Sequence, residues 1–100
     1  MAKRSKEWTA GLAKDLQNIR FAQQFIIASL KEDIPLQLVL AKVIRAYGIK
    51  EFAAKVRMAP SNISRAINPK YNATHGTLNK LLRPFGLKLS VVPIEQKLAA

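Results

Sequence analysis

Residues 60–67, PSNISRAI, carry two kinds of side chain at the spacing of a short helix. Ile63, Ala66 and Ile67 fall on one side, which is the pattern of a face that packs inward. The other side holds hydroxyls, a carboxamide and a guanidinium, which can bond base edges or phosphate oxygens. Eight helical residues span about 12 Å, and the major groove of DNA is about 12 Å wide. The candidate DNA-binding residues here and nearby are Lys50, Lys55, Pro60, Ser61, Asn62, Ser64, Arg65, Asn68, Lys70 and Tyr71.

Net charge is the strongest compositional signal. The 100 residues include 17 Lys and Arg against 6 Asp and Glu, a formal charge of +11. Such an excess attracts polyanions, meaning nucleic acid or an anionic membrane surface, although a generally solubilising surface would also carry it. We expect no membrane partner, because the most hydrophobic window, residues 25–30, is too short to span a bilayer. The absence of cysteine excludes disulfides and thiolate chemistry, which suits a cytoplasmic protein.

Residues that could support catalysis or bind a metal are scarce. His75 is the only histidine and falls in a polar, turn-prone stretch, with no second histidine or cysteine at the spacing of metal ligands. The acidic residues suit helix caps and ion pairs better than general acid–base work. A glycine-rich phosphate loop is absent. We therefore expect no enzyme activity, no cofactor and no metal site.

The elements that must position the polar face form one predicted domain, residues 1–100. Apolar residues at helical spacing predict N-terminal helices over 5–31 and a helical core over 34–86. Residues 87–93 alternate apolar and polar side chains, which predicts a strand. The expected fold class is therefore all-α, with one short C-terminal β-strand.

Capping residues mark the expected helix boundaries. Asp33 and Pro35 predict a helix start, since Asp can cap free amides and Pro tolerates the first turn. Gly48 predicts the end of that helix. Further on, Thr77 is predicted to cap a helix that Gly86 closes.

Two short helices, residues 50–57 and 60–68, are predicted to pack across one another through a tight turn. Ala53 is small enough to let the second helix approach the first, and Val56, Met58 and Ile63 would fill the crossing. The outer face of the second helix would then be free. An ordinary pair of helices in a bundle would show the same pattern, but the surrounding cations favour a surface that binds nucleic acid.

The segment IKEFAAKVRMAPSNISRAIN resembles the helix-turn-helix of the lambda-repressor-like (Cro/C1, XRE) superfamily. From about Phe25 to the end of FGLKLSV the chain is similar to the HigA-like putative addiction-module antidotes, with TLNKLL-x-x-FGLKLS as the most family-specific part. The resemblance implies a helix-turn-helix bundle. It also implies a DNA-binding antitoxin that represses its own operon and neutralises a RelE/HigB-like toxin.

Three features depart from that family pattern. Arg57 occupies a turn position where the superfamily usually has glycine and a positive φ, so either the backbone is strained by about 1 kcal/mol or the turn differs. Ala59 stands where a capping Ser or Thr is common. The third departure is the strongly positive charge, because an acidic antitoxin would be the better electrostatic match for a basic toxin.

A lone strand leaves its amides and carbonyls without partners. We expect residues 87–93 to pair with the same strand of a second copy in a homodimer; addition to another protein's sheet and a solvated tail are the alternatives. A two-fold dimer would also place two short helices on half-sites about 34 Å apart. Residues 5–31 are the candidate surface for a toxin, because they lie outside the DNA-contacting unit and carry surplus apolar residues.

Three functional hypotheses therefore remain at this point. The first is a dimeric repressor of a type II toxin–antitoxin module, and the second is a stand-alone phage-type or chromosomal regulator without a toxin. A small basic RelE-like reading frame next to the gene would favour the first. The third is a helical protein–protein adaptor, whose binding would survive alanine replacement of the polar face.

Overall fold

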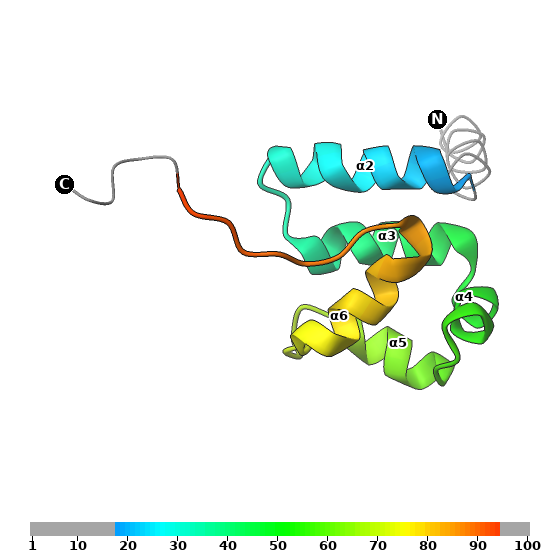
Figure 1. Cartoon of the computed structure of the whole chain (residues 1–100). Coiled ribbons are helices and arrows are strands. Elements are labelled where there is room, and N and C mark those ends of the chain that lie inside the picture. Colours follow the sequence, from blue (N-terminus) through cyan, green and yellow to red (C-terminus); the bar gives the residue numbers. More distant parts are fainter. Residues whose placement is uncertain (1–17, 95–100) are drawn as a thin grey trace, which may run out of the picture.

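A computed structural model describes residues 18–94, and this part of the chain is all-helical (Figure 1). The expected all-α class is confirmed to that extent. The helix predicted within residues 5–17 lies outside the described residues, whereas α2 matches the second N-terminal helix. No described helix is long and apolar enough to cross a membrane. The elements are α2 (Ile19–Lys31), α3 (Leu36–Tyr47), α4 (Ile49–Val56), α5 (Pro60–Ala66), α6 (His75–Leu82) and the 3-10 helix η1 (Arg83–Phe85).

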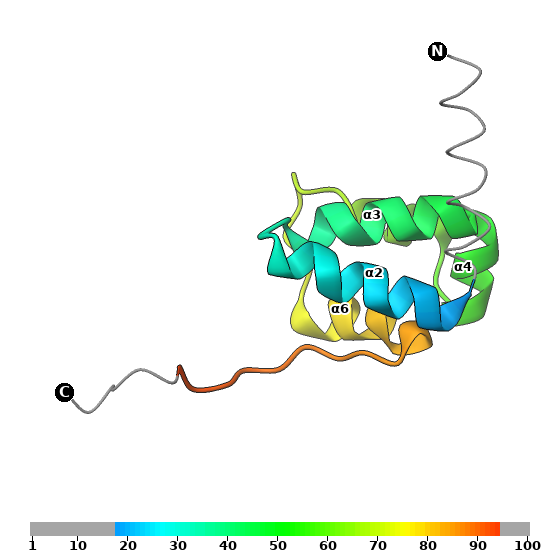
Figure 2. The same ribbon diagram turned by 90° about the horizontal axis from the view of Figure 1, so that it is seen from above.

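The core lies between α2 and α3, which pack side by side, and the three shorter α-helices on the other side of α3 (Figures 1 and 2). Phe52 of α4 is central. Its ring is stacked with the Phe85 ring and nearly perpendicular to the Tyr47 ring, and the ring centroids are 5.7 Å apart in both pairs. Burying each such side chain stabilises the fold by about 1.5–3 kcal/mol. The largest fully buried side chains are Phe52, Phe85, Ile26, Leu40, Ile44, Ile63, Ile67, Leu81 and Val43.

Two helix caps differ from the prediction. Asp33 does not cap α3: it has a φ of 62°, and Pro35 is the residue that precedes the helix. Pro35 has no side-chain acceptor, so α3 starts without a side-chain cap, and the Pro35 carbonyl accepts from the N–H groups of Leu38 and Val39. The helix predicted to start at Thr77 begins at His75, and Thr74 is its cap, with its Oγ1 accepting from the Thr77 N–H at 3.1 Å. The first turn of α6 is polar, so the apolar pattern begins after the helix has already started.

Glycine ends two of the helices as expected. Gly48 follows α3 with a φ of 110°, and its N–H donates to the Ile44 carbonyl at 2.8 Å. Gly86 follows η1 with a φ of 72° and donates to the Arg83 carbonyl at 2.9 Å. Both conformations lie where a Cβ atom is disfavoured, so these positions suit glycine.

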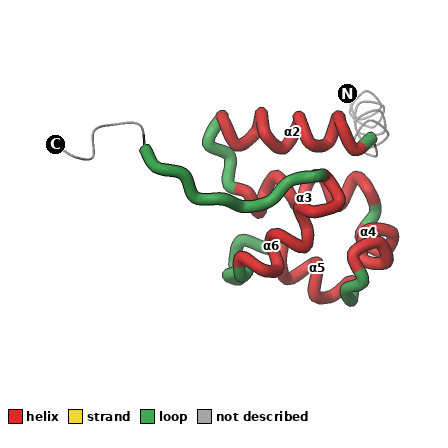
Figure 3. The backbone as a smooth tube through the Cα atoms, in the orientation of Figure 1, coloured by secondary structure: helices red, strands yellow, loops and turns green. Residues whose placement is uncertain are grey.

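The predicted strand over 87–93 is not confirmed, because residues 18–94 contain no strand. Residues 87–94 form an open segment that first passes along the helices, with Leu87 and Leu89 packed against the core, and then leaves them (Figure 3). A strand requires a neighbour that pairs with its amides, and this single chain does not supply one there. Leu89 is instead fastened by its N–H, which donates to the Asn79 side-chain Oδ1 at 2.6 Å. Beyond it, Val91 and Val92 are 91% and 74% exposed.

Candidate nucleic-acid interface

The turn between α4 and α5 consists of residues 57–59, and its shape depends on Arg57. This residue adopts the left-handed conformation, with φ 56° and ψ 50°. Its N–H donates to the Ala54 carbonyl at 3.3 Å, and the Met58 N–H donates to the Ala53 carbonyl at 3.0 Å. This pair of bonds ends α4 and usually places a glycine where Arg57 stands. The positive φ considered from the sequence is therefore present, with a non-glycine residue in it.

The α5 helix buries one side and exposes the other. Ile63 is fully buried, Ala66 is 6% exposed, and Ile67, just after the helix, is 1% exposed. These are the three residues that the spacing placed inward. The helix starts with Pro60 after Ala59, which offers no side-chain cap. The polar and cationic outer residues, all exposed, are Ser61, Asn62, Ser64 and Arg65.

The sequence-predicted site residues are distributed around this helix. Lys50 and Lys55 lie at the two ends of α4, while Lys70 and Tyr71 lie on the loop after α5. Asn68 differs from the others, because it is half-buried and its Oδ1 accepts from the Lys70 N–H at 2.9 Å. That bond shapes the loop, so the Asn68 oxygen already has a structural role. The exposed members of the predicted set are Lys50, Lys55, Pro60, Ser61, Asn62, Ser64, Arg65, Lys70 and Tyr71.

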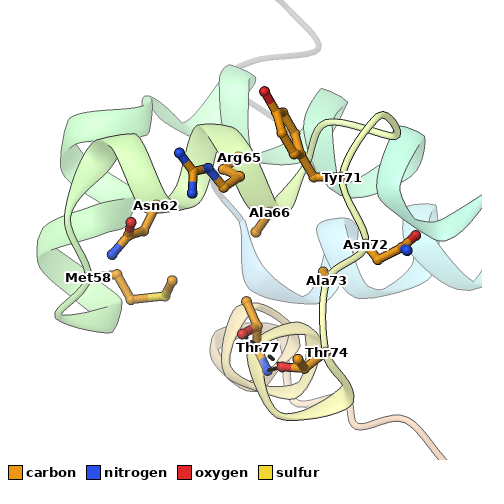
Figure 4. Close-up of a pocket in the computed structure, with 9 residues that line it drawn as sticks. All are labelled: Met58, Asn62, Arg65, Ala66, Tyr71, Asn72, Ala73, Thr74 and Thr77. Carbon is orange, nitrogen blue, oxygen red and sulfur yellow. Dashed lines mark hydrogen bonds between the residues drawn. The ribbon is translucent and has the colours of Figure 1, made fainter.

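Arg65 is held in place by an aromatic ring. Its guanidinium carbon lies 5.5 Å from the centroid of the Tyr71 ring, a cation–π contact between α5 and the following loop. The two side chains border a hollow of about 360 Å³ that α5, the loop and the start of α6 enclose (Figure 4). Asn62 and Thr77 line the same hollow. At an exposed site such a contact favours this position of the guanidinium by about 0.5–1 kcal/mol.

Gln37, which the sequence did not single out, fastens the loop after α5. Its side-chain Nε2 donates to the Ala66 carbonyl at 2.7 Å and to the Tyr71 carbonyl at 3.1 Å. The Asn68 carbonyl lies within reach of the same amide at 3.4 Å. One residue of α3 therefore fixes the end of α5 to the loop that carries Tyr71. Its partners are 29 to 34 positions away, so no local pattern could have identified it.

The surface around α5 is strongly cationic. Glu51 is the only acidic residue between positions 50 and 83. The seven Lys and Arg side chains in the same span are all exposed. Three of these, Arg57, Lys80 and Arg83, were not among the predicted site residues. The potentials of such cations add where no acid offsets them, and the summed potential attracts anions.

Residues 18–94 contain no group of three His, Cys, Asp or Glu side chains that could hold a metal ion. His75, at the start of α6, is exposed. Comparisons of the chain with protein-family models, with curated proteins and with solved structures found no match.

Proposed function

We propose that this protein is a sequence-specific DNA-binding transcriptional repressor, with α4 and α5 as a lambda-repressor-like helix-turn-helix and α5 as its recognition helix. The observation that carries the proposal is the exposure of the outer face of α5. Ser61, Asn62, Ser64 and Arg65 are all open to solvent, so no part of the described chain blocks the approach of a duplex. A hidden polar face would have excluded this mechanism.

Base contacts would come from the exposed face and phosphate contacts from its surroundings. The Arg65 guanidinium, oriented by Tyr71, can form a bidentate pair with guanine O6 and N7. Ser61 and Asn62, in the first turn of α5, can bond neighbouring base edges or phosphate oxygens. Lys50 and Lys70 lie outside α5 and would form ionic contacts with DNA phosphates next to the major groove.

The proposal includes a homodimer that joins through the C-terminal segment. One seven-residue helix can contact only a few base pairs, and a two-fold dimer doubles the contacted sequence. Val91, Val92 and Ile94 are strongly exposed for apolar residues, at 91%, 74% and 65%. Pairing this segment with the same segment of a second copy would cover these side chains and satisfy the backbone groups of both.

The more specific form of the proposal is an antitoxin that represses its own operon and neutralises a RelE/HigB-like toxin. It rests on the resemblance to the HigA-like family and on the surface of α2. Ile19, Phe21, Ile27 and Leu30 of that helix are each about 40% exposed, which leaves apolar surface for a partner. A RelE-like gene product encoded next door should copurify with this protein; without such a neighbour, a stand-alone regulator is favoured.

The DNA-binding proposal is tested by titrating a fluorescent duplex from the region upstream of the gene, beside a scrambled duplex of equal composition. The wild-type protein should prefer the upstream duplex. Arg65→Ala should reduce that preference by about 5- to 150-fold, the value of one bidentate base contact (about 1–3 kcal/mol). Arg20→Ala is the matched control, because Arg20 is an exposed cation on α2, across α3 from α5 (Figure 1).

Two results would overturn the proposal. One is equal affinity of the wild-type protein for both duplexes, which would indicate binding by charge alone. The other is an Arg65→Ala variant that keeps the full preference. An adaptor protein would show no DNA preference, and alanine at the four outer positions of α5 would leave its protein binding unchanged.

A further inference from the structure

A second cationic surface lies beside the α4–α5 turn. It is a groove of about 450 Å³ between the end of α4 and the end of α6. Four of its six lining residues are cations and none is an acid. The lining residues are Lys55, Val56, Arg57, Lys80, Arg83 and Pro84. We call this surface the α4–α6 groove.

The cations of the groove come from two separate elements that the fold brings together. Lys55 and Arg57 are contributed by α4 and the turn, whereas Lys80 and Arg83 are 23 or more positions further along the chain. All four side chains are exposed, so water screens their mutual repulsion without removing it. A bound anion would relieve that repulsion, so four cations around one groove with no acid among them favour an anionic ligand.

Arg57 adds an independent observation. It holds a left-handed backbone conformation that costs an L-residue free energy and that glycine would adopt freely. Arg57 is also one of the residues that line the groove. Strained positions in folded proteins concentrate at functional sites, where the strained residue contributes something that a relaxed one could not. Glycine at this position would relax the turn and would remove a cation from the groove.

We propose that the α4–α6 groove binds the sugar–phosphate backbone of the DNA whose bases α5 contacts, an inference that rests on the proposed function. Two facts favour DNA over an acidic protein segment. Arg57 precedes the first residue of α5 by only three positions, so groove and recognition helix adjoin. Residues 52–83, which supply the lining of the groove up to Arg83 and all of α5, contain no acid, so no carboxylate of this stretch would repel the repeated negative charges of a DNA backbone.

The test uses the full-length protein and a double variant, Lys80→Gln with Arg83→Gln, which removes two charges and leaves an uncharged polar side chain at each position. Affinity for the upstream duplex is measured between 0.05 and 0.3 M salt, roughly the range in which phosphate contacts dominate. The double variant should show a salt slope shallower by about 1.8 and an affinity about 10- to 60-fold lower at 0.1 M salt. The loss should be equal on upstream and scrambled duplexes, because phosphate contacts do not distinguish sequence.

A charge-matched control separates this site from a general effect of net charge. Arg20→Gln with Lys31→Gln removes two exposed cations from α2 and should leave the slope unchanged. Melting temperatures of all variants establish that they are folded. A groove double variant that binds with wild-type salt slope and affinity would overturn the proposal. So would an α2 control whose slope and affinity fall as much as those of the groove variant. Failure of the proposed function would appear differently, as a wild-type protein without preference for the upstream duplex.

Discussion

Replacing Arg57 with glycine should make the protein more stable and a poorer DNA binder. The left-handed conformation of Arg57, φ 56° and ψ 50°, costs an L-residue roughly 1–2 kcal/mol. Glycine removes that cost but gives the unfolded chain more freedom, which takes back about 0.5–1 kcal/mol. The expected net gain in the free energy of unfolding is about 0.5–1 kcal/mol. For a domain of this size, that gain corresponds to a rise in melting temperature of about 2–8 °C.

The same substitution removes one cation from the α4–α6 groove. Losing one phosphate contact should lower the salt slope by about 0.9 and the affinity at 0.1 M salt by about eightfold. Two companion variants separate the effects. Arg57→Ala removes the charge and keeps the positive φ, so it should weaken DNA binding without raising the melting temperature. Arg57→Lys keeps the charge and the strain, so both properties should stay close to wild type.

Thermal unfolding followed by circular dichroism gives the stability, and fluorescence anisotropy of a labelled duplex gives the affinity. The decisive comparison is glycine against alanine, because only the backbone conformation distinguishes their effects on stability. Equal melting temperatures for these two variants would refute the strain argument. Undiminished DNA affinity in both would refute the assignment of Arg57 to a phosphate contact.

Two further substitutions test how the contact surface is held in place. Tyr71→Ala should reduce the specific affinity for DNA about two- to fivefold, because it frees the Arg65 guanidinium from a cation–π contact that contributes about 0.5–1 kcal/mol at an exposed site. Tyr71→Phe keeps the ring and should not reduce this affinity. Equal affinities of the two variants in anisotropy titrations would contradict this role. Gln37→Ala should lower the free energy of unfolding by about 1–3 kcal/mol, since the carbonyls of Ala66 and Tyr71 lose their donor. Denaturant titration measures that change, and Gln24→Ala, an exposed glutamine on α2, is its control.

The helices of the described region could be predicted because their apolar residues recur at helical spacing. The pattern identified the buried side of α5, with Ile63, Ala66 and Ile67, and the glycines that end α3 and η1. Local chemistry sufficed for these features. The helical class of the fold followed from them without any knowledge of long-range contacts.

The features that the sequence did not reveal depend on contacts between distant or competing groups. Gln37 bonds carbonyls 29 to 34 residues away, which no window of sequence can contain. Thr74 and Thr77 are both plausible caps, and only the polar first turn of α6 decides between them. The alternation over residues 87–93 indicates a strand, but the backbone needs a partner before it can become one. The four cations of the α4–α6 groove can be read from the sequence, but only the fold shows that they lie together.

The bond between Leu89 and Asn79 gives the C-terminal segment a mechanical connection to the rest of the molecule. Asn79 belongs to α6, and the same helix borders the hollow beside α5 through Thr77 and the α4–α6 groove through Lys80. A partner that binds the segment beyond Leu89 would therefore sit on a chain anchored to the one helix that borders both surfaces.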